Sequence, residues 1–153
     1  MMQVSFSVRG VRQRLAQVER ERAELLALGE AMCREFRERF PEGPAYLTRY
    51  ADQTANEYRW RRSSAKRWRG ERVHAATLDL TSEPGRALLQ TLPDSVRQVW
   101  LAYEQRRIDL NLAVAQVNYE RRRLRDWLAR TAAIGELSQN SAEDPTPLSV
   151  VSA

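Results

Sequence analysis

Arginines and aromatic residues gather in one short segment of this sequence, residues 57–72. The segment holds seven of the 25 basic residues and two of the 20 acidic ones, so its charge of +5 equals that of the whole sequence. The other 18 basic and 18 acidic residues balance, which is typical of helices with ion pairs on their exposed sides. The excess positive charge is therefore local.

This composition suits a nucleic-acid surface, because positive side chains bind phosphates and aromatic rings stack on bases. We therefore predict a DNA-binding site, with the candidate residues Arg59, Trp60, Arg61, Arg62, Lys66, Arg67, Trp68, Arg69 and Arg72. If most of the basic side chains contacted a duplex, log K would fall with log salt concentration with a slope of about −4 to −6.

Two other interpretations fit the same residues. Trp60 and Trp68 could anchor a core, with the arginine heads reaching outward around them. The segment could also dock an acidic protein, or the chain's own Glu143 and Asp144. The exposure of the two tryptophans separates these alternatives: exposed rings favour binding, whereas buried rings make the segment an ordinary solvated face.

The sequence offers no familiar catalytic or metal site. With one histidine (His74) and one cysteine (Cys33), a Cys/His zinc site cannot form within one chain. The six glycines form no phosphate loop, no serine lies in a nucleophile elbow, and no carboxylate pair stands out. We expect a non-enzymatic protein without cofactor or metal. Cys33 follows Met32 on an apolar stripe and should act as a small hydrophobe.

Two long helices, at about 8–40 and 94–130, are expected to position the segment. Each has a seam of apolar residues spaced alternately by four and three. The first seam is Val11, Leu15, Val18, Leu25, Met32 and Phe36; the second is Val96, Trp100, Tyr103, Leu110, Val114, Val117, Leu124 and Leu128. Arg22, Gly29, Arg107 and Arg121 fill skipped positions, and the arginines either mark register and partner choice or lie at the solvent edge.

These elements predict an all-α fold, a long antiparallel helical hairpin with a smaller helical or mixed insert at 45–92. In the insert, 46–55 could form a short helix, Tyr58 and Trp60 have a strand-like period, and Ser63 could begin a helix that runs to Leu80. Ser82-Glu-Pro84 should begin another helix. Because two helices bury little alone, a third element or a second copy should close the core. We expect one domain at 1–135 and a disordered tail at 136–153.

The sequence has no run of 18 apolar residues and no secretory signal in its first nine, and it has a single cysteine. We therefore expect a cytoplasmic protein without membrane contact. The candidate partners are DNA, another protein, and a second copy joined through the helical seams.

Two motifs carry a resemblance. They are Tyr58-Arg-Trp-Arg-Arg62, followed by Ser64 and Trp68, and Arg107-Ile-Asp-Leu-Asn-Leu112. Together they resemble a small uncharacterised family encoded in integrative conjugative elements of proteobacteria, some of whose members are labelled integrase regulators. The resemblance covers about half of the chain, 56–128, and implies an accessory or regulatory role in a mobile element. We therefore expect binding to DNA or DNA-bound machinery; the alternative is a coiled-coil interaction or assembly protein without nucleic-acid contact.

Overall fold

Most of the described residues are in helices. The computed structural model describes residues 1–51, 56–63 and 77–143. In these ranges α1 spans Val8–Arg39, α2 spans Glu83–Gln90 and α3 spans Asp94–Glu143. The helix α3 therefore continues past its predicted end near 130 and includes 136–143, which the sequence assigned to the tail. Alanine, leucine and glutamate in this stretch favour helix. The rest of the predicted tail lies outside the described residues.

The all-α prediction is wrong, because the insert forms an antiparallel sheet. Its strands are β1 (Ala45–Ala51), β2 (Asn56–Arg62) and β3 (Thr77–Leu78), in the order β1-β2-β3. The short helix predicted for 46–55 is therefore a strand where it is described. The helix predicted to end at Leu80 has a strand near that end, and 64–76 lie outside the described residues.

The register explains why these residues form strands. Leu47 pairs with Trp60, and both are buried. Because side chains alternate between the two faces of a strand, this pairing sends every second residue to the core. The sheet therefore buries apolar side chains that a helix over the same residues would distribute around its axis.

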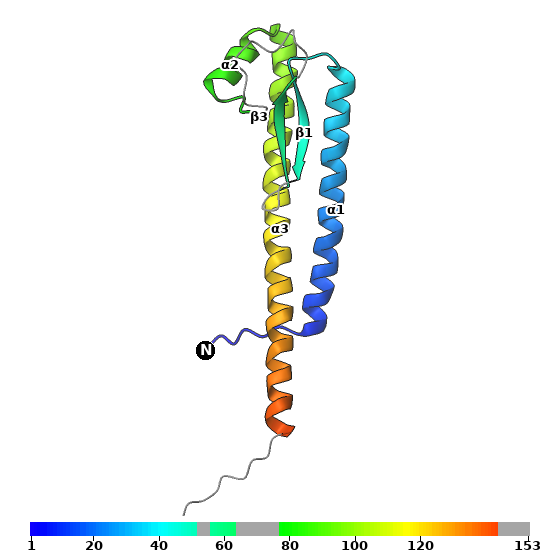
Figure 1. The fold of residues 1–153 in the computed structure, drawn as a ribbon, viewed down its shortest axis with the longest axis vertical. Helices are drawn as coiled ribbons and strands as arrows, with labels where there is room; N and C mark the ends of the chain where they lie inside the picture. The colour runs from blue at the N-terminus through cyan, green and yellow to red at the C-terminus, as the bar shows by residue number, and fades with distance from the viewer. Residues whose placement is uncertain (52–55, 64–76, 144–153) are drawn as a thin grey trace, which may run out of the picture. The chain divides into compact units, whose positions relative to one another are not determined.

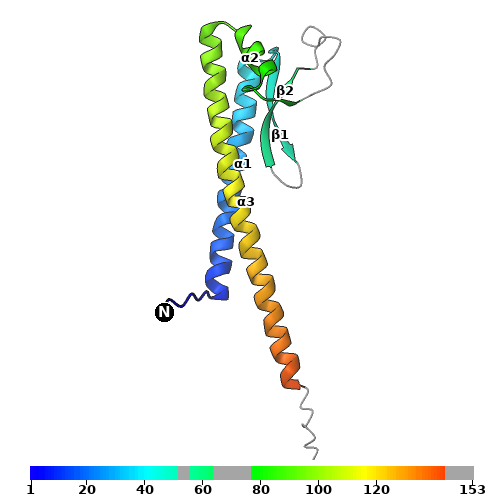
Figure 2. The same cartoon turned by 90° about the vertical axis from the view of Figure 1, so that its left-hand side faces the viewer.

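The chain divides into two compact units, to which both α1 and α3 contribute. The large unit is Arg20–Asn118; the small unit combines Met1–Glu19 with the chain from Tyr119 onward. In the large unit, β1 and β2 lie along one side of the paired helices (Figures 1 and 2). The two helices run antiparallel there, since Arg22 bonds Asn118 while Glu35 bonds Tyr103.

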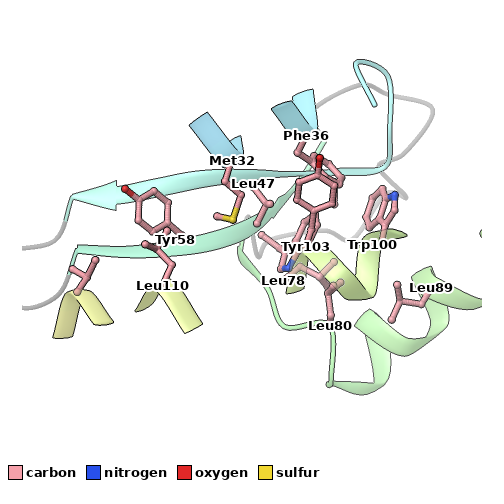
Figure 3. Packing of buried hydrophobic residues seen from close by; sticks show 13 residues of the cluster. Met32, Phe36, Leu47, Tyr58, Leu78, Leu80, Leu89, Trp100, Tyr103 and Leu110 are labelled. Atoms are coloured by element: carbon pink, nitrogen blue, oxygen red, sulfur yellow. The ribbon is translucent and has the colours of Figure 1, made fainter. Parts of the chain in front are cut away.

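The core of the large unit joins the helix pair to the sheet (Figure 3). Phe36 makes edge-to-face contacts with Trp60, Trp100 and Tyr103 at centroid distances of 4.9, 5.0 and 5.0 Å. The sheet is thus the third element that the two helices required. The buried cluster comprises Met32, Phe36, Ala45, Leu47, Tyr58, Trp60, Leu78, Leu80, Leu89, Trp100, Tyr103, Leu110 and Val114.

Several seam residues of the large unit are covered by the chain's own elements. Met32, Phe36, Trp100 and Val114 are each at most 2% exposed. A second copy is therefore not required to bury these seam positions.

The helix α2 begins as its sequence predicted. Ser82 is the N-cap, its hydroxyl accepts a hydrogen bond from the Gly85 amide, and proline occupies the first turn. Leu89 of α2 packs in the buried cluster. Gly85 packs so closely on the backbone of Asp79 and Leu80 that a Cβ there would collide with it.

The small unit is joined by apolar contacts and ion pairs. Val11 and Val18 are buried. Glu19 accepts a hydrogen bond from Arg121 at 2.8 Å, and Arg14 donates to Glu120 at 2.6 Å. No helix in the described ranges has the length and apolar character needed to cross a membrane.

Candidate nucleic-acid interface

Alternation along β2 sends its side chains to two different environments. Tyr58 and Trp60 are 0% and 1% exposed and face the helices. Arg59 lies between these two residues in the strand, and Arg61 follows Trp60. By alternation both arginines point to the opposite face, and both are half-buried. Within β2 the sheet thus separates Trp60, whose ring lies inside, from Arg59 and Arg61, which lie on the outer side.

Stacking of Trp60 on a base is expected only if its ring is exposed, and the residue is 1% exposed with its ring in the core. Its indole lies parallel to that of Trp100, with ring centroids 5.1 Å apart and an interplanar angle of 5°. Its Nε1–H donates a hydrogen bond of 2.6 Å to the Glu104 carboxylate. By the criterion stated from the sequence, this ring favours a solvated arginine face.

The remaining predicted contacts fall into two groups. Arg62 pairs with Ala45 across the sheet and is half-buried; by alternation it belongs to the inner face, at the end of the strand. The other five predicted residues lie outside the described residues: Lys66, Arg67, Trp68, Arg69 and Arg72.

Other aromatic rings accompany the two outward arginines. Tyr46 and Tyr50 lie on β1 in the phase opposite to buried Leu47, so they occupy the same face as Arg59 and Arg61. Figure 2 shows that α1 and α3 lie on the other side of this hairpin. The outer sheet face, as we use the name, comprises Tyr46, Thr48, Tyr50, Arg59, Arg61 and Thr77. Glu57, which pairs with Tyr50 in the register, has the same phase in β2 as the two arginines.

Arginine and tyrosine form two pairs on the outer sheet face. Tyr46 lies directly opposite Arg61 in the register. The Arg59 guanidinium lies over the Tyr50 ring, 4.5 Å from its centroid, and Tyr50 remains 45% exposed. Such cation–π pairs hold the charge and the ring together at a surface. The face therefore combines the two chemistries that the sequence assigned to the arginine-tryptophan run.

Sequence reasoning missed Tyr46 and did not assign Tyr50 to the site. Residues 46–50 read Tyr-Leu-Thr-Arg-Tyr, in which a tyrosine, a threonine and a tyrosine alternate with other residues. This segment has a period of two, and so does the segment with Tyr58 and Trp60. The two periods together could have identified a hairpin with two tyrosines on one side.

The helix α3 fixes β2 through a polar cluster that the sequence also did not anticipate. Arg107 donates to both carboxylate oxygens of Glu104, at 2.7 and 2.8 Å, and to the Tyr58 carbonyl oxygen at 3.0 Å. The Asn111 side chain accepts from the Tyr58 amide at 2.9 Å and donates to its carbonyl oxygen at 3.0 Å. With the Trp60 indole on Glu104, this cluster holds the strand in register.

The two motifs that carried the resemblance therefore meet in space. Tyr58 of the first motif accepts hydrogen bonds from Arg107 and Asn111 of the second, and Trp60 donates to Glu104, which Arg107 also binds. Their side chains, together with Glu104, are an internal support for the sheet. The outward residues of the first motif, Arg59 and Arg61, lie on the opposite face of the sheet from this support.

The arginines in the seams all make contacts between elements. Arg22 donates to Asn118 at 2.9 Å, Arg107 holds Glu104 and β2, and Arg121 donates to Glu19 at 2.8 Å. These contacts favour the register role over the solvent-edge interpretation, because each arginine pairs one helix with a specific partner group.

Other groups of chemical interest have structural surroundings. Burial raises the pKa of the half-buried Cys33 thiol to about 11, so little thiolate is present at neutral pH. Glu104 lines an open groove of about 390 Å³ beside β3, but its carboxylate already accepts from Trp60 and Arg107. No cluster of three potential metal-ligating side chains occurs within the described residues.

No protein-family model, curated protein or solved structure matches this chain. What the protein does must therefore follow from the chemistry of its own surfaces.

Proposed function

We propose that the protein is a non-enzymatic accessory protein that binds DNA through the outer sheet face. The observation that carries the proposal is the coincidence of Arg59 and Arg61 with Tyr46 and Tyr50 on one side of the sheet, away from the helix pair. Guanidinium groups bind phosphates, and tyrosine rings at a surface offer stacking area.

The local charge supports the same proposal. The segment from which the outward arginines come carries the entire net charge of the sequence. A positive site in an otherwise balanced molecule attracts a polyanion to one place. The resemblance to proteins of integrative conjugative elements suggests the context, an accessory or regulatory role in a mobile element.

The test is fluorescence anisotropy of labelled oligonucleotides at about 50 and 200 mM salt. The Arg59→Gln/Arg61→Gln variant should bind about tenfold more weakly and lower the salt slope by about 1.4, since each lost phosphate contact on a single strand removes about 0.7. The matched control is Arg12→Gln/Arg20→Gln, which removes two exposed arginines from α1. Equal losses in both variants, or no binding by the native chain at low salt, would contradict the proposal.

A second candidate function, a protein-interaction role without nucleic-acid contact, has its own observation. Leu101, Ile108 and Leu112 of α3 are 40%, 45% and 60% exposed. Spacings of seven and four residues put them on one side of the helix. If the native chain self-associates, Ile108→Gln/Leu112→Gln should shift light-scattering mass toward the 17.7 kDa monomer. A concentration-independent monomer mass would remove self-association from this candidate.

A further inference from the structure

A single strand has unstacked bases that can stack on protein rings, whereas the bases of a duplex are already stacked on one another. The outer sheet face has the rings that a single strand would use. We propose, on the basis of the proposed function above, that the face binds single-stranded DNA with one base stacked on Tyr46 and another on Tyr50.

The spacing of the two tyrosines is the first argument. They are four residues apart in β1, which at about 3.3 Å per residue puts their attachment points about 13 Å apart along one face. Thr48, a small residue, lies between them on this face. The two rings are therefore separate platforms, each of which can take a base without crowding the other.

The position of the arginines is the second argument. Arg61 lies across the sheet from Tyr46, and the Arg59 guanidinium lies over Tyr50 at 4.5 Å. Each stacking platform thus has a cation beside it on the neighbouring strand. A single strand has a phosphate beside every base, so a repeated pair of ring and cation complements its repeating unit.

The exposure of Tyr50 is the third argument. The residue is 45% exposed although the Arg59 guanidinium lies over its ring. In a duplex the bases are already stacked on one another and present only their edges in the grooves. Only unstacked bases can use the face of an exposed ring, so this area contributes to binding a single strand and little to binding a duplex.

The experiment compares one sequence in three forms: a labelled DNA strand of about 12 nucleotides, its duplex, and the RNA of the same sequence. Anisotropy at about 50 mM salt should give at least about tenfold tighter binding of the single-stranded DNA than of the duplex. Tyr46→Leu and Tyr50→Leu should each weaken binding of the single strand by about 5- to 100-fold, while Tyr46→Phe and Tyr50→Phe retain it.

The outcomes separate this inference from the function on which it rests. Salt-sensitive binding that is as tight for the duplex, or unchanged by the leucine variants, would overturn the inference and leave the DNA-binding proposal standing. Tighter binding of the RNA would overturn the choice of DNA. Absence of binding to all three forms would overturn both proposals. The comparison of strands uses the native chain, so it decides even if a leucine variant does not fold.

Discussion

At the scale of single residues, Gly29 and Tyr58 show how the sheet fits the helix pair. The Tyr58 ring lies in the space that a Cβ at position 29 would occupy, and its hydroxyl donates to the Leu26 carbonyl oxygen at 3.2 Å. Tyr58 is fully buried, so its ring cannot move aside without disturbing the core. A glycine inside a long helix is unfavourable by itself, and the close approach of this ring is the reason for it.

Gly29→Ala should therefore destabilise the protein. Alanine favours helix by about 1 kcal/mol over glycine, but overpacking a filled core costs about 1–3 kcal/mol and displaces Tyr58 from β2. Because the added Cβ meets a fully buried ring, the cost should lie at the upper end, about 2–3 kcal/mol. We therefore expect a net loss of about 1–2 kcal/mol in the free energy of unfolding, measured by urea denaturation followed by circular dichroism.

Gly135→Ala is the matched control, because a Cβ there meets no atom within 4 Å. The same substitution in α3 should leave stability unchanged or raise it by up to about 1 kcal/mol. A Gly29→Ala variant that behaves like the control would show that the ring of Tyr58 does not fill this space.

At the scale of elements, the helices were predictable and the sheet was not. A seam over several heptads repeats one signal many times, so α1 and the start of α3 could be located within a residue or two. The strands are only seven, seven and two residues long, and each gives the period-two signal at most a few times. The sequence therefore predicts no more than a helical or mixed insert.

The residues of the candidate site illustrate the same limit. The charge excess of 57–72 could be read directly, because charge does not depend on pairing. Which of Trp60 and Tyr46 faces outward depends on the register between β1 and β2, and no local pattern specifies that register. The sequence consequently selected the buried ring, Trp60.

The anchoring of β2 on α3 makes a prediction at this scale. Arg107→Met would leave the Glu104 carboxylate, 9% exposed, without its ionic partner, and a buried unpaired charge typically costs about 3–5 kcal/mol. We expect a loss of about 3 kcal/mol in unfolding free energy. Adding Glu104→Gln should recover part of it, because glutamine is neutral and still accepts from Trp60.

Arg130→Met in the same helix is the control. Arg130 pairs with Asp126, but the two side chains are 80% and 50% exposed, so the substitution should change stability by less than about 0.5 kcal/mol. If Arg107→Met is equally mild, or if Glu104→Gln gives no recovery, the cluster does not hold β2 in the way described.

In the whole molecule, the basic and acidic residues outside the basic segment balance in number, and several of them form ion pairs between α1 and α3. In the small unit, hydrogen bonds from Arg121 and Arg14 hold the pKa of Glu19 and Glu120 below the ordinary value of 4.5. In the large unit, the Tyr103 hydroxyl and then Arg106 lower the pKa of Glu35. These pairs stabilise the helices and leave the outward arginines as a distinct feature.

The direction of these shifts predicts acid sensitivity. A carboxyl whose pKa is lower in the folded state contributes stability above its unfolded pKa, about 4.5, and loses it as pH falls through the folded value. In urea denaturation, the contribution of these carboxylates to the free energy of unfolding should therefore be constant above about pH 5. The free energy of unfolding should fall below about pH 4.5.

The Glu19→Gln/Glu120→Gln variant should flatten this fall, since two of the titrating groups are removed. Glu24→Gln, an exposed substitution on α1, is the control and should preserve it. Identical acid profiles for both variants would mean that the ion pairs of the small unit do not contribute to stability.

Nuclear magnetic resonance can show residue by residue whether the outer sheet face contacts nucleic acid. A ¹⁵N-labelled sample of this 17.7 kDa chain would be titrated with single-stranded DNA at low salt, and the amide shifts followed residue by residue. Among the described residues, we expect the largest shifts in β1 and β2 around Tyr46, Tyr50, Arg59 and Arg61. Shifts confined to the exposed sides of α1 and α3, or no shifts at low salt, would contradict it.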